Sequence, residues 1–270
     1  IRYFKYQIWY SLMMRKKSAS APAVDRALDV IELLAASDRD LALSEILKRV
    51  HIPRQSLVRI LNTLCDRGIV NRADQRGFYR PGMKLLYLGD RLKEKIRLRS
   101  LAWPFMQELA EKTGKTIELS TRDRDQIILI EQIEGTEGVR LYSRVGSGYP
   151  YFHAVGVGKI YLAHMDPEKR RKVLHKIGLP AVTAHTITHR DALEAELLKV
   201  QENGYAFEDQ ELRTGVRRVA APIYGFHNHL AGCIGIAATI LSFGLDHRED
   251  LGHMTLQTAK KISYRMGKQR

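Results

Sequence analysis

Side chains that can read base pairs or hold phosphate gather on one short segment in the first third of the chain. Gln55, Arg59 and Asn62 follow one another at spacings of four and three residues, which places them on one face of a helix. Arginine, glutamine and asparagine form bidentate hydrogen bonds with guanine or adenine edges in the major groove. Ser56 and Thr63 flank this recognition ridge (Gln55, Arg59 and Asn62) and are short enough to contact phosphate oxygens. The segment predicts a surface for double-stranded DNA.

The other side of the same segment is apolar. Four residues recur at positions i, i+3, i+4 and i+7: Leu57, Ile60, Leu61 and Leu64. We expect a helix that Pro53 opens, that runs to about Arg67 and that ends at Gly68. An ordinary amphipathic helix with a solvated outer face has the same pattern, so the ridge needs support from its surroundings.

Two helices and a hairpin surround the expected recognition helix. Helical spacing begins at Val24, and Ser44 resembles an N-cap for a short helix over Glu45–Val50. Two short strands, Ile69–Val70 and Phe78–Arg80, enclose a basic tip. This order predicts a winged helix-turn-helix, in which the hairpin (the wing) can reach a minor groove or the phosphate backbone. The candidate DNA-contacting residues are Ser44, Arg54, Gln55, Ser56, Arg59, Asn62, Thr63, Arg72, Arg76 and Arg80.

Charge supports this reading. The 270 residues carry a formal net charge of +14, and residues 1–95 contribute 19 basic and 10 acidic side chains, a net of +9. A basic first third is typical of a protein that binds a polyanion. One alternative remains open: a non-specific nucleic-acid binder, in which this positive charge alone accounts for the binding.

Composition limits the class of protein. Hydrophobic residues make up 44% and charged residues 27%, as in a globular chain with a sizeable core. Cys65 and Cys233 are the only cysteines, so we expect no disulfide framework, a reducing compartment and a cytoplasmic location. The longest apolar stretch, Leu230–Leu241, is too short to cross a bilayer, and no membrane partner is expected.

The composition of the first residues differs from that of the rest of the chain. Residues 1–13 are aromatic and basic, and their charges follow the apolar stretch, opposite to the order in a signal peptide. We interpret residues 1–22 as a leader, with residues 1–13 as upstream sequence or a cloning remnant and Met13 or Met14 as the natural start. A leader that touches a membrane is the alternative.

The second half mixes helices and strands without regular alternation, which predicts an α+β domain around a mostly antiparallel sheet. Helices are expected over 84–96, 100–112, 156–164, 167–176, 191–202 and 246–266. Strands are expected over 116–121, 126–133, 139–145, 205–208, 216–224 and 230–239. We expect His227-Asn228-His229 to form the turn between the last two strands.

The chain from Ala23 to Met266 resembles the IclR family of bacterial transcriptional regulators. The matching segments are Ala23–Leu28, Leu43–Ile46, Ile52–Leu61, Tyr79–Gly82, Gly204–Ala206 and Gly215–Pro222. The resemblance implies a winged helix-turn-helix over 23–82, a linker helix over 83–98 and a GAF-like effector domain over 99–270. It also implies a repressor or activator of catabolic genes, more commonly a repressor, that is a dimer or a dimer of dimers and responds to a small organic acid.

The resemblance further implies an effector pocket. Its residues here would be His153, Gly156, Val157, Glu208, Arg218, Gly235 and Ala237. Arg218 stands where the family usually has cysteine, and Gly235 and Ala237 replace serines. We hypothesise that Arg218 holds the effector's carboxylate in a bidentate pair and that the small residues leave room for an aromatic or sugar-derived acid. The alternative is that Arg218 pairs with Glu208.

We expect no catalytic residues, no metal site and no cofactor. The ten histidines show no metal-ligand spacing, and no nucleophile stands in a recognisable order with a base. Gly156-Val157-Gly158-Lys159 resembles part of a phosphate-binding loop, but His153 and Ile160 occupy positions where that loop needs glycine and a hydroxyl residue. A small-molecule-processing enzyme with an accessory nucleic-acid-binding domain is the second alternative function.

Overall fold

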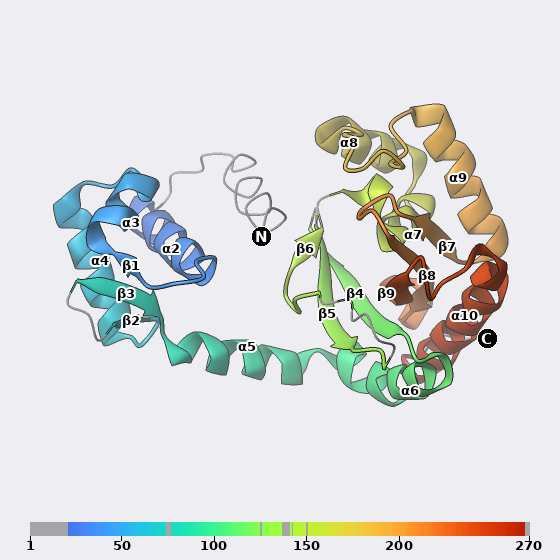
Figure 1. Cartoon of the computed structure of the whole chain (residues 1–270), viewed down its shortest axis with the longest axis horizontal. Coiled ribbons are helices and arrows are strands. Elements are labelled where there is room, and N and C mark those ends of the chain that lie inside the picture. Colours follow the sequence, from blue (N-terminus) through green and yellow to red (C-terminus); the bar gives the residue numbers. More distant parts are fainter. Residues whose placement is uncertain are drawn as a thin grey trace. The chain divides into compact units, whose positions relative to one another are not determined.

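The computed structural model of the chain has two units that divide between Lys95 and Ile96 (Figure 1). It describes residues 21–73, 77–124, 126–136, 141, 143–149 and 151–267. The expected leader therefore lies outside the described residues, apart from Ala21 and Pro22, and so do Arg76 and the tip of the wing.

Three helices form the core of the first unit: α2 (Pro22–Ala35), α3 (Leu43–Val50) and α4 (Arg54–Asp66). Their apolar faces meet in one cluster that contains Leu34 and Ile46. His51, with a φ of 39°, ends α3 in the left-handed region, and the chain then turns into α4. Pro53 is the N-cap of α4 rather than its first residue, a shift of one position from the expected start.

The wing is part of a small antiparallel sheet. β2 (Val70–Arg72) and β3 (Phe78–Pro81) form the expected hairpin, and β1 (Leu41–Ala42), which the sequence analysis did not anticipate, pairs with the other edge of β3. A Cβ on Gly82 would lie 2.1 Å from the carbonyl oxygen of Gly68. Glycine at this position lets the chain leave β3 against the turn that follows α4.

The expected helix after the wing is α5 (Met83–Lys95). It ends at Lys95, and α6 (Arg97–Thr113) begins after Ile96, which has an extended conformation. Leu98 is buried in the core of the second unit, so α6 belongs to that unit although the expected linker reached residue 98.

A six-stranded sheet forms the centre of the second unit, in the order β6-β5-β4-β9-β8-β7 with every neighbouring pair antiparallel. The strands are β4 (Thr116–Asp123), β5 (Gln126–Ile133), β6 (Gly148–Tyr149), β7 (Ala206–Asp209), β8 (Val216–Tyr224) and β9 (Leu230–Thr239). The strand expected over 139–145 is not formed at the described Leu141 and Ser143–Val145, and β6 takes the place beside β5. The main-chain groups of Leu141 and Ser143 bond instead to the side chain of Gln132.

Helices cover the sheet. Residues of α6 and α10 (Arg248–Arg265) share a large apolar core with the central strands, including Met106, Ile117, Ile236 and Ile262 (Figure 1). α7 (Gly156–Ala163) packs against β7, β8 and β9, and α8 (Pro167–Ile177) and α9 (Arg190–Asn203) follow it. Short 3-10 turns lie at Phe152–Ala154 (η1), Phe226–Asn228 (η2) and Leu245–His247 (η3), and η2 forms the turn that we expected between β8 and β9.

No helix in the described part of the chain is long and apolar enough to cross a membrane.

Candidate nucleic-acid interface and buried charged cluster

Helix α4 has the two faces that its sequence predicts. Leu57, Leu61 and Leu64 are buried against α2 and α3, whereas Gln55, Arg59 and Asn62 are exposed. The other described candidates are exposed except for Ser56, which is half-buried: Ser44, Arg54, Thr63, Arg72 and Arg80. The first unit thus presents a polar ridge and a basic wing on an apolar support.

Asn62 and Arg72 are joined directly. A guanidinium N–H of Arg72, on β2, donates to Oδ1 of Asn62, on α4, at 2.9 Å. Sequence reasoning selected both residues as independent contacts and missed their bond. Their ten-residue separation, with a turn between them, gave no sequence signal for it.

Thr63 uses its hydroxyl locally. The hydroxyl donates to the carbonyl oxygen of Arg59 at 3.0 Å, one helical turn back. A phosphate oxygen only accepts hydrogen bonds, so Thr63 in this rotamer has no proton to offer it.

Ser44 is not the N-cap of α3, as we had expected. The helix begins at Leu43, and the cap is made by Glu45, whose carboxylate accepts from the main-chain N–H of Ala42 at 3.0 Å. Arg39 forms two hydrogen bonds with the same carboxylate, and together these bonds lower the pKa of Glu45 to about 2. Ser44 is therefore the second residue of the helix, with its side chain exposed.

All seven candidate effector residues are buried, on β7, β8, β9 or the η1–α7 segment. Arg218 lies opposite Ala237 and Glu208 in the strand register, and Gly235 lies opposite Glu118. The structure therefore brings the predicted strand residues into one region of the sheet.

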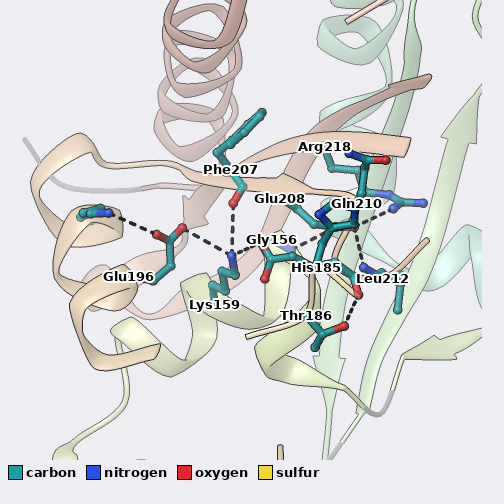
Figure 2. Close-up of polar contacts among 12 residues, drawn as sticks. Gly156, Lys159, His185, Thr186, Glu196, Phe207, Glu208, Gln210, Leu212 and Arg218 are labelled. Atoms are coloured by element: carbon teal, nitrogen blue, oxygen red, sulfur yellow. Dashed lines mark hydrogen bonds and ion pairs between the residues drawn. The ribbon is translucent and has the colours of Figure 1, made fainter. Parts of the chain in front are cut away.

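Arg218 is bound between two carboxylates. Its Nη1 donates to Glu208 at 3.1 Å and its Nε donates to Glu118 at 3.3 Å (Figure 2 shows the Glu208 side). The alternative pairing with Glu208 is therefore the one present, and Glu118, on β4, is a partner that sequence reasoning missed. The hydroxyl of Ser143 donates to the other oxygen of Glu118 at 2.9 Å.

A second buried cation lies close by. The Lys159 ammonium, on α7, donates to Glu211 at 2.5 Å, to the carbonyl oxygen of Phe207 at 3.3 Å and to Glu196 at 3.4 Å (Figure 2). We had considered Lys159 only as part of an incomplete phosphate-binding loop. Its three acceptors come from the protein itself, which gives the residue a structural role.

We call Glu118, Lys159, Glu208, Glu211 and Arg218 the buried charged cluster. Its three carboxylates outnumber its two cations. Burial raises the pKa of Glu208, against the opposing effects of Arg218 and Lys159, and raises that of Glu211 to about 7. Protonation of Glu211 below about pH 7 therefore removes part of the excess negative charge of the cluster.

Two positions near the cluster require glycine because a main-chain oxygen lies too close for a Cβ atom. A Cβ on Gly158 would lie 2.2 Å from the carbonyl oxygen of Phe152, which fixes glycine where α7 crosses η1. A Cβ on Gly235 would lie 2.7 Å from the carbonyl oxygen of Val219, so close approach within the sheet, rather than space for a ligand, accounts for glycine there.

His153 completes this side of the sheet. Its Nε2 lies 3.0 Å from the carbonyl oxygen of Pro180, which only accepts, so Nε2 carries the proton. Burial lowers the pKa of His153, and its Nδ1 is a buried acceptor without a hydrogen-bond partner among the described residues. Across the described part of the chain, no group of three or more His, Cys, Asp or Glu side chains could hold a metal ion.

Comparison with known proteins agrees with this arrangement in both units. The family described as "Bacterial transcriptional regulator IclR C-terminal" matches residues 91–264, and the "IclR helix-turn-helix domain" matches residues 23–74. The chain is 28% identical over 257 residues to Transcriptional repressor IclR of Escherichia coli (strain K12), covering 92% of this chain and 93% of that protein. It is 30% identical over 215 residues to HTH-type transcriptional regulator XynR of the same strain, covering 80% and 85%. The crystal structure of a transcriptional regulator from Alicyclobacillus acidocaldarius superposes with a TM-score of 0.80 at 29% identity, covering 92% of this chain and 100% of that one.

Proposed function

The chain belongs to the IclR family of bacterial transcriptional regulators, and we propose that it represses a catabolic operon until a small organic acid binds its second unit. It is a DNA-binding regulator and not an enzyme, as the family and the names of its relatives state. The chromosome is its site of action, so we place it in the cytoplasm.

Helix α4 is the element that we propose for the major groove. Gln55 and Arg59 are exposed, and their side chains form no hydrogen bond with another residue in the described part of the chain, so both can bond to base edges. Arg54 and Ser56 lie in the first turn of α4, and the N-terminus of a recognition helix can contact the sugar–phosphate backbone of the DNA. The exposed Arg80 and the Asn62-bound Arg72 supply positive charge from the wing.

We propose that two copies pair through the first unit. Helices α2 and α5 expose apolar side chains that a solvated monomer would leave in water: Val24, Leu28, Met83, Leu86, Tyr87, Leu88 and Leu92. On α5 alone, exposures of 48% at Leu88 and 62% at Leu92 are high for leucines one helical turn apart. A dimer offers two recognition helices, which fits an operator with two half-sites, and pairing of dimers into a tetramer extends the same proposal.

The effector site that we propose is the face of the sheet that carries Glu208, Arg218, Gly235 and Ala237, with His153, Gly156 and Val157 on the covering segment. Buried ionisable groups in excess of their counter-charges support a ligand there, because such groups cluster at functional sites. An acid effector would exchange its carboxylate for Glu118 or Glu208 as a partner of Arg218. By linkage, it changes operator affinity only as far as it prefers one state of the dimer.

The exposed polar ridge of α4 on its buried leucine support is the observation that carries this proposal. The test is to select genomic fragments that bind the full chain and to footprint the best of them with and without candidate acids. Arg59→Ala should weaken the footprint, whereas Arg67→Ala, which removes an equal charge from the end of the same helix, should preserve it. Equal binding of all fragments by the wild type, or equal effects of the two substitutions, would favour a non-specific nucleic-acid binder.

A further inference from the structure

Helix α8 carries most of the excess positive charge of the second unit. Residues 96–270 hold 25 basic and 20 acidic side chains, a net of +5. Within that range, Pro167–Ile177 holds five basic side chains and one acidic side chain, a net of +4. The net charge of the second unit is therefore concentrated on one helix rather than spread over its surface.

The helix has a packed side and a cationic side. Leu174 is its one fully buried residue, and Arg170 is held on the same side, where its Nη2 pairs with Glu194 of α9 at 2.8 Å and its Nη1 donates to the carbonyl oxygen of Leu162 at 3.3 Å. Figure 1 shows α8 at the periphery of the second unit. The remaining cations of the helix are exposed, and we call them the α8 basic face: Lys169, Arg171, Lys172 and Lys176.

Acidic side chains do little to neutralise this face. Lys169, Arg171 and Lys172 form no ion pair with another residue in the part of the chain that the structure describes. Asp166, the N-cap of α8, uses its carboxylate on the main chain, since it accepts from the N–H groups of Glu168 at 2.8 Å and Lys169 at 3.3 Å. Glu168 is the only acid within the helix, so the exposed side keeps a clear excess of positive charge.

This arrangement of charges costs the helix stability. Lys169 and Lys172 lie at positions i and i+3, and Lys172 and Lys176 at i and i+4, where like charges repel each other. The cations in the first two turns also oppose the helix dipole, whose positive end is the N-terminus. A helix that only needs a solvated outer side has no use for such an arrangement, whereas a polyanionic partner would offset its cost.

DNA is the polyanion that fits. The chain already binds DNA through its first unit, and the duplex next to a bound operator is present at a high effective concentration. Lys169 and Lys176 are separated by about 10 Å along the helix axis, and duplex DNA carries one phosphate charge per about 1.7 Å of its own axis. Lysine and arginine side chains contact such phosphates without regard to sequence.

We propose that the α8 basic face binds the sugar–phosphate backbone of the DNA beside the operator, as a second contact that is independent of base sequence. The inference rests on the DNA-binding function of the first unit and adds nothing to base reading. Affinity then depends on the length of duplex around the operator, and this dependence requires the cations of α8.

The test measures binding of the full chain to operator fragments of three lengths at several salt concentrations. The shortest is the smallest selected fragment that keeps base-specific binding, and the others add about one and about two helical turns (about 10 and 20 base pairs) of unrelated sequence at each end. The affinity of the wild type should rise about tenfold or more with length at low salt. Its salt slope should steepen by about 3 for each chain bound, as three added phosphate contacts imply.

The variant Lys169→Gln/Arg171→Gln/Lys172→Gln should bind the shortest fragment as the wild type does and should gain nothing from the added duplex. It should also keep the helical signal of the wild type, because all three side chains are exposed. Hydroxyl-radical footprints should show protection of the flanking backbone by the wild type and none by the variant.

The matched control is Arg190→Gln/Lys260→Gln/Arg265→Gln, which removes three exposed positive charges from α9 and α10 of the same unit. It should keep the full dependence on length. The proposal fails if the wild type gains nothing from the added duplex, or if the control loses as much as the α8 variant. Equal gains by the wild type and the α8 variant would also overturn it and would make an acidic protein surface the partner to seek. Base-specific binding to the shortest fragment reports on the first unit alone, so the regulatory proposal is tested separately.

Discussion

Asn62 and Arg72 form a bond between the recognition helix and the wing, with 2.9 Å between the guanidinium nitrogen and Oδ1. An asparagine that pairs with adenine needs its oxygen as an acceptor and its NH2 group as a donor. The oxygen of Asn62 already accepts from Arg72, so we assign Asn62 to positioning the wing arginine rather than to reading a base.

This assignment makes the two residues energetically dependent on each other. We expect Arg72→Ala to weaken binding to all DNA sequences and to reduce the salt slope by about 1, as the loss of one phosphate contact does. Asn62→Ala should cause part of the same loss, without relaxing specificity at any base pair. The double variant should bind no worse than Arg72→Ala, as measured by titration of operator and unrelated DNA at several salt concentrations.

Additive losses in that cycle would show that the two residues act separately. If Asn62→Ala loses its preference among base pairs at one operator position, Asn62 reads a base directly.

Base reading should therefore depend on Gln55 and Arg59. We expect Arg59→Ala to cost about 1–3 kcal/mol at one operator position and to equalise affinities for the four base pairs there. Arg80→Ala, on the wing, should lower affinity evenly across sequences. Competition binding with a complete set of single-base operator variants distinguishes the two patterns, and an even loss in Arg59→Ala would contradict its role.

Exposed leucines on α5 predict a dimer that charge can break. The double variant Leu88→Glu/Leu92→Glu should sediment as a monomer and retain its helical signal, because both side chains are exposed within one chain. Operator affinity should fall by at least about tenfold, since the two half-sites no longer bind together. Asp90→Ala, on the same helix, should leave mass and affinity unchanged, and a double variant that keeps the wild-type mass would place the interface elsewhere.

Strands and helices with a strong apolar pattern could be predicted from the sequence. The expected bounds of β8 and β9 are those observed, because both strands are rich in apolar residues, β8 begins directly after Gly215, and the η2 turn separates the two strands. β1 has only two residues, and pairing with β3 alone defines it. No local pattern can reveal such a strand.

The polar contacts of the site could be predicted only in part. Arg218 and Glu208 are ten residues apart on a strand pair, and their pairing was one of two alternatives. Glu118 is 100 residues from Arg218, and it reaches the guanidinium only through the β4–β9–β8 order of the sheet. Long-range ion pairs of this kind depend on topology, which one sequence does not specify.

Glu211 predicts a pH dependence of folding. Burial raises its pKa from 4.5 to about 7 in the folded chain. The folded state then holds the proton more tightly than the unfolded state, so this contribution to stability is complete below about pH 4.5 and is lost as the pH rises to about 7. The loss is about 3 kcal/mol in the free energy of unfolding.

Urea unfolding of the wild type and of Glu211→Gln across this pH range isolates the effect. The difference between the two free energies should change by about 3 kcal/mol in favour of the variant as the pH rises. Asp246→Asn, at an exposed carboxylate outside the cluster, is the control and should follow the wild type. A constant difference between wild type and Glu211→Gln would show that Glu211 titrates normally.

Arg218 predicts proton uptake when an acid effector binds. A carboxylate that displaces Glu208 from Arg218 leaves Glu208 fully buried without that counter-charge, and burial already raises its pKa. Glu208 should then take up a proton, so binding should tighten as the pH falls. Calorimetry in two buffers of different ionisation enthalpy should show uptake of about one proton per effector in the wild type and much less in Glu208→Gln. If the wild type takes up no proton while it binds the acid, the effector leaves the pair of Arg218 and Glu208 intact, and its carboxylate either replaces Glu118 on Arg218 or is held by another group.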